Sequence, residues 1–147
     1  MNVLKMKKQN KIYPYFFLIL LSPFAVLQAK TVTVTVQGIS FEPMITHIQP
    51  GDTVQWLNMN VHSTTSVDNL IPDKEEGWDS PIGHNYEKAF THEGIYLYKC
   101  KPHANLGMAG VIIVGNPSSN LEAFRAADKQ GPLGNVIKKA ISYAENL

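Results

Sequence analysis

The sequence predicts a mainly β protein, a β-sandwich with two C-terminal α-helices packed on it. Two observations predict this fold class. Short alternating or apolar segments recur between residues 31 and 115, separated by turns rich in Gly and Pro, as in sandwiches. After residue 118 the apolar positions change to the i, i+3, i+4 spacing of amphipathic helices. The sandwich is therefore expected over 31–115 and the helices over 118–146.

The alternating segments predict the strands in order. In TVTVTVQ (31–37) three valines alternate with threonines, which is typical of a half-buried strand. The stretch QPGDTVQWLN (49–58) reads as a turn that leads into a second strand. Three more strands are expected at 86–91, at 95–100, which ends on a cysteine, and at 110–115, which is apolar and bounded by glycines.

Two short helices are expected in the C-terminal segment. SNLE (119–122) has the pattern of a capping box, and Leu121, Phe124 and Ala127 would share one face. After Gly131-Pro132 the apolar residues at 133, 136, 137, 140, 141 and 144 follow helical spacing. A membrane-surface helix is the alternative, but only Lys138 and Lys139 lie on its polar face. Packing against the sandwich is therefore favoured.

Residues 1–29 have the composition of a secretory signal peptide. Four lysines and no acid precede the apolar run YPYFFLILLSPFAVL (13–27), and the small Ala29 offers a cleavage point before Lys30. A retained membrane anchor is the alternative, but the run is short for a span and Pro23 interrupts it. We therefore expect a single domain, 30–147, that is exported to the periplasm and has no stable membrane insertion.

Removal of residues 1–29 would change the net charge. All 12 acidic residues lie after position 29, but only nine of the 13 basic residues do, so the segment 30–147 has a net charge near −3. This charge argues against nucleic acid as a partner.

The chain contains one cysteine, Cys100, in YKCKPHANLGMAG (98–110). A single cysteine cannot form an internal disulfide. It could be a small buried side chain, a leftover free thiol, an intermolecular bridge or a metal ligand. An exposed thiol is prone to oxidation in an exported protein, and coordination to a metal would remove that hazard.

Cys100, His103 and Met108 form the pattern C-x2-H-x4-M in a loop constrained by Pro102 and Gly107. A thiolate, an imidazole and a thioether together suit a soft or borderline metal. A good site needs a further ligand, and the chain offers four more histidines: His47, His62, His84 and His92.

The positions of the four histidines separate them as candidate ligands. His62 follows a predicted strand, at the end of the sandwich where the Cys100 loop is expected. His92 lies eight residues before Cys100, on the order of 25 Å of extended strand, and is a poor candidate. His47 is expected to be an exposed strand residue. His84, which precedes the strand at 86–91, competes with His62.

FEP (41–43), PGDTVQW (50–56), His62, GIYLYKCKPH (94–103) and GMAGVIIVG (107–115) resemble the cupredoxins, the small blue copper proteins. The resemblance covers 31–146 and is closest to the pseudoazurins, with plastocyanins and amicyanins as relatives. The two helices after Gly115 favour the pseudoazurins.

The resemblance implies a cupredoxin-like Greek-key β-sandwich that holds one type 1 copper ion. It implies that the copper ligands are His62, Cys100, His103 and Met108. It also favours His62 over His84, because the 38 residues between His62 and Cys100 fit the family and the 16 from His84 do not. Ser63 departs from the family pattern, which usually has Asn directly after the first ligand. Since hydrogen bonds near the thiolate tune the copper potential, this departure bears on the potential rather than on the metal.

The function implied is that of an exported type 1 copper protein, not an enzyme, which shuttles single electrons by Cu(I)/Cu(II) cycling. Redox partners, such as a c-type cytochrome or a copper or haem reductase, are expected to dock on an apolar patch near His103. The patch would consist of Pro102, Ala104, Asn105 and Leu106. The protein is expected to be a monomer.

Two other classes of function are weighed. A periplasmic copper carrier or storage protein would use the same affinity without redox cycling, but Met44 and Met59 make no Met-rich tract. A copper enzyme would need a second, open metal site, and His47, His84 and His92 are too scattered to supply one.

The charges around the loop point in two directions. Lys99 and Lys101 flank the thiol and would favour a partner with an acidic face. The acidic run DNLIPDKEEGWDS (68–80) would instead steer basic partners to the site if it bordered the copper end, and is otherwise a solvated loop.

Overall fold

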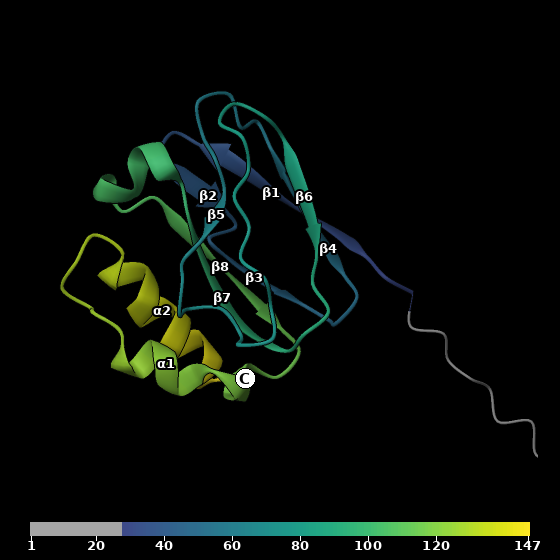
Figure 1. Ribbon diagram of the computed structural model, residues 1–147, viewed down its shortest axis with the longest axis vertical. Coiled ribbons are helices and arrows are strands. Elements are labelled where there is room, and N and C mark those ends of the chain that lie inside the picture. The colour runs from purple at the N-terminus through teal and green to yellow at the C-terminus, as the bar shows by residue number, and fades with distance from the viewer. Residues whose placement is uncertain (1–27) are drawn as a thin grey trace, which may run out of the picture.

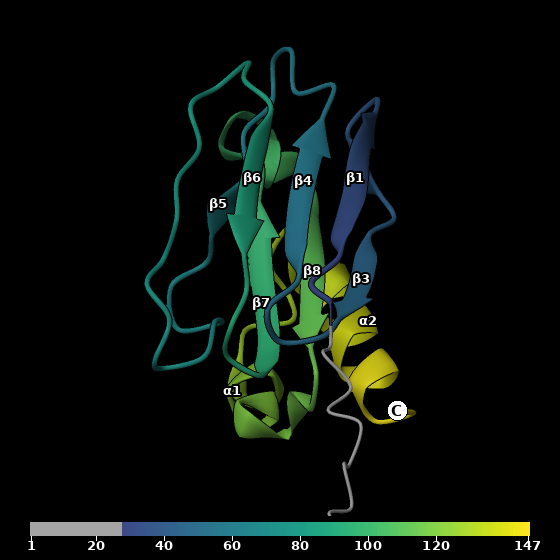
Figure 2. The same cartoon turned by 90° about the vertical axis from the view of Figure 1, so that its right-hand side faces the viewer.

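The computed structural model describes residues 28–147, which form two four-stranded sheets packed face to face (Figures 1 and 2). The prediction of a signal peptide falls on residues outside this range, apart from the exposed Gln28 and Ala29. The first sheet has the strand order β2-β1-β4-β6, with β1 Thr31–Gln37, β2 Ser40–Glu42, β4 Thr53–Leu57 and β6 Tyr86–Ala89. The second has the order β3-β8-β7-β5, with β3 Ile45–Ile48, β5 Thr65–Ser66, β7 Gly94–Lys99 and β8 Ala109–Val114.

All five strands expected from the alternation are present, and the first has the expected bounds. Within the stretch 49–58 only Thr53–Leu57 is a strand, β4, because Gly51 and Asp52 belong to the turn before it. The strand at 95–100 ends one residue early, so Cys100 follows β7 instead of closing it. The strands β2 and β5 are only three and two residues long, and neither was predicted because no periodic pattern extends over so few residues.

Strands β7 and β8 are buried on both faces, which explains why β8 is apolar throughout instead of alternating. One face of the pair looks into the sandwich. The other is covered by α1 Leu121–Ala126 and α2 Gly134–Ala144, as Figure 1 shows. Side chains of this outer cluster include Ile95, Leu97, Val111 and Ile113 from the strands and Phe124, Val136, Ile137 and Ala140 from the helices. The expectation that the helices pack on the sandwich is confirmed.

Within residues 28–147 no helix is both long enough and apolar enough to cross a membrane. The apolar face of α2 packs against the sheet, with Val136, Ile137 and Ala140 buried.

The capping box predicted at 119–122 is wrong. Helix α1 begins at Leu121 with no hydrogen bond from a side-chain cap. The Ser119 hydroxyl donates to the carbonyl of Glu93 at 2.9 Å. The Asn120 amide both accepts from the backbone N–H of Ile95 and donates to its carbonyl, each at 2.8 Å. These two side chains therefore tie the start of the helical segment to the start of β7.

The inner core is dominated by aromatic rings. The Trp56 ring from β4 lies 5.3 Å from the Tyr98 ring of β7, and Phe41 lies 4.8 Å from Tyr98 on another side. Tyr98 pairs with Gly110 across the β7–β8 ladder. The Tyr98 ring occupies the space that a side chain at position 110 would need, since a Cβ there would lie 2.3 Å from the phenol oxygen.

Candidate metal centre

Three loops meet at one end of the sandwich. They are the segment 58–64 after β4, the segment 80–85 before β6, and the 3₁₀ helix η1 Lys101–Leu106 between β7 and β8. Two hydrogen bonds join them: the Gly83 N–H donates to the carbonyl of His62 at 2.9 Å, and the Lys101 N–H donates to the Ser63 hydroxyl at 3.1 Å. The loops from both sheets therefore form one connected end.

The local geometry of the cysteine loop follows from its sequence. Cys100 has an extended backbone and begins η1, and Pro102 stands in the first turn, where its missing N–H costs nothing. Gly107 ends the turn in the left-handed region at φ 81°. The Cys100 N–H then donates to the carbonyl of Met108 at 3.0 Å, and the Met108 N–H donates to that of His103 at 3.2 Å. The loop is thereby closed on itself.

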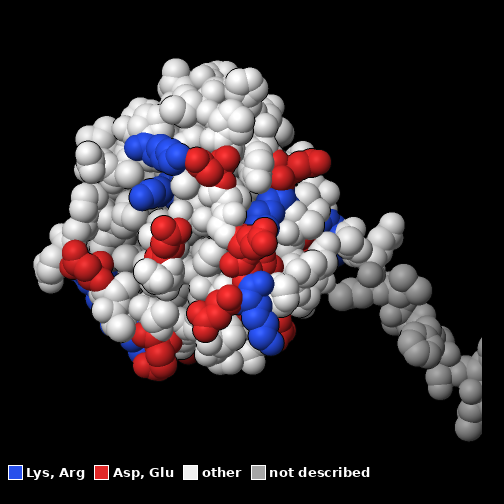
Figure 3. All heavy atoms as spheres, viewed as in Figure 1, with Lys and Arg blue, Asp and Glu red and all other residues white. Residues whose placement is uncertain are grey.

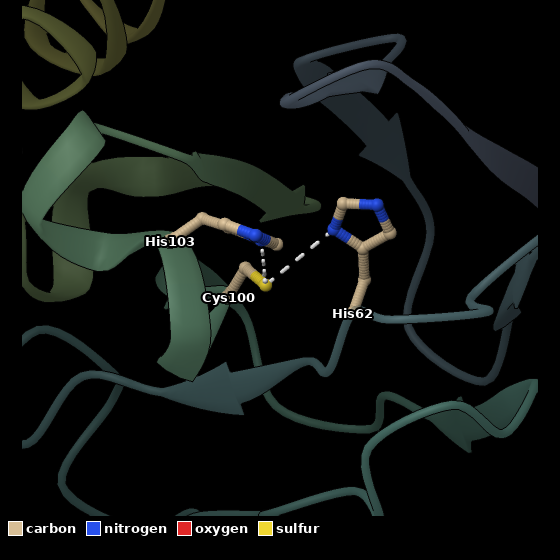
Figure 4. Close-up of side chains that lie close together, drawn as sticks. All are labelled: His62, Cys100 and His103. Carbon is tan, nitrogen blue, oxygen red and sulfur yellow. Dashed lines mark hydrogen bonds between the residues drawn. The ribbon is translucent and has the colours of Figure 1, made fainter.

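The side chains of His62, Cys100 and His103 converge (Figure 4). The Cys100 Sγ lies 3.7 Å from the His62 Nδ1 and 3.3 Å from the His103 Nδ1. The potential ligand atoms all lie within 4.8 Å of one another, and the two imidazole ring centres are 4.8 Å apart. Both rings direct Nδ1 toward the sulfur, so three donor atoms face one point.

These separations fit one metal ion. A borderline metal such as zinc sits about 2.0 Å from imidazole nitrogen and about 2.3 Å from thiolate sulfur, which puts the two ligand atoms roughly 3.3–3.8 Å apart for angles of about 100–120°. Met108 is fully buried and belongs to the same packed cluster of side chains as Cys100. A cysteine thiolate, two imidazoles and a methionine thioether together are the donor set of a copper site, and the two loops supply these side chains.

Burial favours the neutral form of the His62 imidazole. Cys100 is 0% exposed and His62 is 7% exposed, whereas His103 is only partly buried. Burial lowers the pKa of His62, and the nearby His103 ring lowers it further. Since a metal binds the neutral imidazole, both effects keep His62 ready for coordination at neutral pH.

Ser63 connects the two loops that carry the three donor atoms. Its side chain is fully buried, and its hydroxyl accepts from the Lys101 N–H, one residue after Cys100. Ser63 thus makes a bond between the His62 and Cys100 loops. Sequence analysis identified the residue but could not give its partner, because that partner is a backbone group 38 residues away.

Replacing Ser63 by Ala is expected to loosen this connection. The Lys101 N–H would lose its acceptor, at a cost of about 1 kcal/mol in the free energy of unfolding. Denaturant unfolding of the metal-free protein measures this cost without any contribution from copper. The same variant loaded with copper should show a shifted midpoint potential. Thr35→Ala, which removes a half-buried hydroxyl on β1 that makes only a long bond of 3.4 Å to the Glu42 carbonyl, is the control, and equal values for the two variants would contradict the connecting role.

A chain of hydrogen bonds that no sequence pattern predicted holds the segment after His62. The Trp78 Nε1 donates to the Thr64 hydroxyl at 3.1 Å, and the Thr64 N–H donates to the Ser80 hydroxyl at 2.9 Å. Thr64 and Ser80 are buried, and Trp78 packs 6.1 Å from Trp56 in the inner core. The side chain of Trp78 is therefore an anchor in the core. No sequence signal marked Ser80 as part of this support.

The remaining histidines lie apart from the cluster. His84 is exposed, and its Nδ1 lies 3.0 Å from the carbonyl of Ile82. His47 is exposed on β3, near the carbonyl of Gly115. His92 pairs with Glu75 at 3.0 Å before the start of β7, at the opposite end of that strand from Cys100. Within residues 28–147 the only group of three or more potential ligands is His62, Cys100 and His103.

The acidic run is divided between the two ends of the molecule. Glu75 contacts Lys88 and His92 at the end remote from Cys100. Asp79 lies near the site and forms an ion pair with Lys101. The hydrogen bonds from Lys101 and Thr65 lower the pKa of Asp79, so its carboxylate stays charged and offsets the Lys101 charge. The site is therefore bordered by a balanced pair rather than by a field of one sign.

The fold and the cluster together define a copper protein built on a β-sandwich. Residues 28–115 match the family model described as copper binding proteins of the plastocyanin/azurin family. The chain therefore belongs to the plastocyanin/azurin family of copper-binding proteins, and copper is its cofactor.

Among the members of this family the chain is similar to pseudoazurins. It is 32% identical to the pseudoazurin of Paracoccus pantotrophus over 88 residues, which are 59% of this chain and 61% of that protein. The match thus spans less than two thirds of that relative's length.

Solved structures show the same similarity over more of the chain. A pseudoazurin from Sinorhizobium meliloti superimposes with a TM-score of 0.72 at 29% identity, covering 79% of this chain and 97% of that one. The pseudoazurin from Methylobacterium extorquens AM1 also gives 0.72, at 24% identity, covering 77% and 98%, and supports the fold. The cupredoxin fold expected from the sequence is confirmed.

Proposed function

We propose that this chain is an exported type 1 (blue) copper protein that carries single electrons between redox partners and is not an enzyme. One observation carries the proposal. The buried Cys100 sulfur and two imidazole nitrogens, which lie 3.7 and 3.3 Å from it, face one point in loops joined by hydrogen bonds. A ligand set held in this way suits electron transfer because it need not rearrange between oxidation states.

In this proposal His62, Cys100 and His103 hold the copper ion and Met108 supplies a weaker axial ligand. Copper, when bound, supplies one-electron chemistry between Cu(I) and Cu(II). The protein's part is to hold the donors. The hydrogen bond between Cys100 and Met108 closes the cysteine loop, and the bond between Ser63 and Lys101 joins that loop to the His62 loop. Both loops are thereby restrained. His103 is the most exposed of the four side chains and offers a path from the site to the surface.

The loops at the end of the molecule that carries the site bear no charged side chain, and the Asp79–Lys101 ion pair lies at their border. The loop segments 57–64, 80–85 and 102–110 contain no Lys, Arg, Asp or Glu, and the uppermost part of the surface in Figure 3 is free of charge. Four of the exposed large apolar side chains lie on turns at this end: Ile39, Val61, Ile82 and Leu106. A redox protein would therefore dock here through a small apolar contact, as suits a short-lived complex.

Leu106→Lys tests this docking end. Leu106 is 65% exposed, so the variant should keep its fold and its visible spectrum while electron exchange with a small redox protein slows at least several-fold. Leu147→Lys is the matched control, because Leu147 is 60% exposed and lies beside His47 and Glu93 at the opposite end. Stopped-flow oxidation of the reduced protein by a c-type cytochrome measures the rate of electron exchange for each variant. Equal slowing in the two variants, or none, would reject the docking end.

A copper carrier or storage protein is the alternative function. Burial of Cys100 and His62 argues against it, because a carrier has to release its ion through accessible ligands. Mixing the copper-loaded protein with a metal-free copper acceptor separates the two functions. We expect rapid electron exchange with the cytochrome and slow metal transfer; fast metal transfer without electron exchange would favour the carrier.

The proposal includes the export of the protein. Residues 1–29 would act as a cleaved signal peptide, and 30–147 would function as a monomeric domain in the periplasm, with 31–115 as the sandwich and 118–146 as the helical segment. The composition of the first 29 residues supports this part of the proposal.

A further inference from the structure

The start of β1 is tied to a nearly buried carboxylate. The Lys30 backbone N–H donates to the Asp52 Oδ1 at 2.7 Å, and the Gln49 N–H donates to the Asp52 Oδ2 at 2.9 Å. Asp52 is only 5% exposed, in the turn before β4. The Lys30 carbonyl accepts from the Thr53 N–H at 2.8 Å. Lys30 is therefore held in place on both sides of its α-carbon, while Gln28 and Ala29 are exposed.

The carboxylate of Asp52 lacks a strong cationic partner in this arrangement. Both of its hydrogen bonds come from neutral peptide groups, and the charge that acts on it is the more distant side chain of Lys30 itself. A carboxylate shielded from water in a turn and bonded only to peptide groups is stabilised further by a hydrogen-bonded cation. The atom at 2.7 Å, the Lys30 nitrogen, would be such a cation if the chain began at that residue.

We propose that cleavage before Lys30 turns this nitrogen into an α-ammonium group that forms an ion pair with Asp52 and locks β1 onto β4. The inference rests on the proposed export. A signal peptidase would hydrolyse the Ala29–Lys30 peptide bond, with water giving its hydroxyl to the Ala29 carbonyl carbon and a hydrogen to the Lys30 nitrogen. The new amine takes up a further proton from solvent. Cleavage would therefore add a stabilising ion pair to the fold as well as remove the signal peptide.

Only one position of cleavage forms the ion pair between the new α-ammonium group and Asp52, which is called the lock below. A chain that begins at Ala29 keeps the neutral Lys30 amide against Asp52 and moves its ammonium about 3.8 Å along the backbone, measured between α-carbons. A chain that begins at Thr31 loses the donor altogether. Of these three termini, only Lys30 places a charged nitrogen on the carboxylate.

The lock has a defined pH dependence. Hydrogen bonds from Gln49 and Lys30 lower the pKa of Asp52, so its carboxylate stays ionised at neutral and alkaline pH. Contact with the carboxylate would raise the pKa of the α-ammonium above its ordinary value of about 7.7–8.0. A raised folded-state pKa gives stability that is complete below about pH 8 and is lost as the pH rises through the folded value. The charged group beside this pair is the Lys30 side chain, which opposes the ammonium and favours Asp52.

The test compares two chains that differ by one residue, one beginning at Lys30 and one at Ala29, each also made with Asp52→Asn. Denaturant unfolding of the metal-free proteins is followed between pH 6 and pH 10.5. At pH 6.5 the folding equilibrium constant of the Lys30 chain should exceed that of the Ala29 chain by about tenfold, which equals one pKa unit of coupling. The difference should disappear at the alkaline end and in both Asp52→Asn chains.

Equal stability of the two chains at every pH would overturn the proposal, and so would a difference that survives Asp52→Asn. The mass of the protein recovered from the periplasm after expression of the full chain gives an independent result. Lys30 as the first residue supports the lock, and any other first residue overturns it. Because the unfolding experiment uses metal-free protein, failure of the copper function would leave its result unaffected.

Discussion

Cys100→Ser is expected to abolish the intense visible absorption that the protein should show with Cu(II). The band of a blue copper site comes from charge transfer between thiolate sulfur and copper, and a serine hydroxyl cannot supply it. Apoprotein should be prepared by stripping and then titrated with Cu(II), because zinc can occupy such a site without colour. The wild-type chain should turn blue with one copper per chain, and the variant should keep only weak absorption.

Two histidine variants make this result specific to the cluster. His62→Ala removes an imidazole nitrogen that lies 3.7 Å from the sulfur and should change or abolish the band. His84→Ala removes an exposed imidazole outside the cluster and should leave it intact. A colourless wild-type protein, or a band that depends on His84 and not on His62, would contradict the proposed ligands. Unfolding curves of each apoprotein verify that the variants fold.

Gly110→Ala is expected to cost about 3 kcal/mol of stability, at the upper end of what overpacking a core usually costs. A Cβ at position 110 would lie 2.3 Å from the Tyr98 phenol oxygen and 2.4 Å from the adjoining ring carbon. The ring cannot retreat, because Trp56 and Phe41 pack against it. Denaturant unfolding of the metal-free protein measures the loss. Since Tyr98 lies two residues before Cys100, the copper-loaded variant should also show an altered spectrum.

The matched control is another glycine whose surroundings can yield. A Cβ at Gly131 would meet only the end of the Asp128 side chain at 3.2 Å, so Gly131→Ala should change the free energy of unfolding by less than about 1 kcal/mol. If Gly110→Ala were as stable as Gly131→Ala, the Tyr98 ring would not be confined as described.

The sheet strands and the helices could be predicted largely from local pattern. Valine–threonine alternation predicted β1 over its full length, and the 3.6-residue spacing predicted α2. The same reasoning was wrong at Ser119 and Asn120. A capping box is a local interaction, whereas these side chains bond the backbone of Glu93 and Ile95, some 25 residues earlier in the chain. A local sequence pattern cannot reveal that these polar atoms hydrogen-bond to a strand that is distant in the sequence.

For the candidate copper site too, local pattern predicted one part and could not predict the other. Cys100, His103 and Met108 lie within nine residues, so their spacing alone predicted a metal loop. The loop's Pro102 and Gly107 likewise indicated a tight turn, because their backbone preferences act within one or two residues. The choice between His62 and His84 rested on resemblance, since both precede Cys100 by many residues and neither spacing dictates contact.

The fold class and the cysteine loop follow from the sequence alone, because periodicity and turn residues are properties of neighbouring positions. Only the tertiary structure decided which histidine meets the sulfur, that Ser63 bonds Lys101, that Asp79 offsets the Lys101 charge and that Asp52 receives the Lys30 nitrogen. Each of these contacts joins residues at least 22 positions apart. Such contacts form only when the strands pair and the two sheets pack, so no local pattern in the sequence contains them.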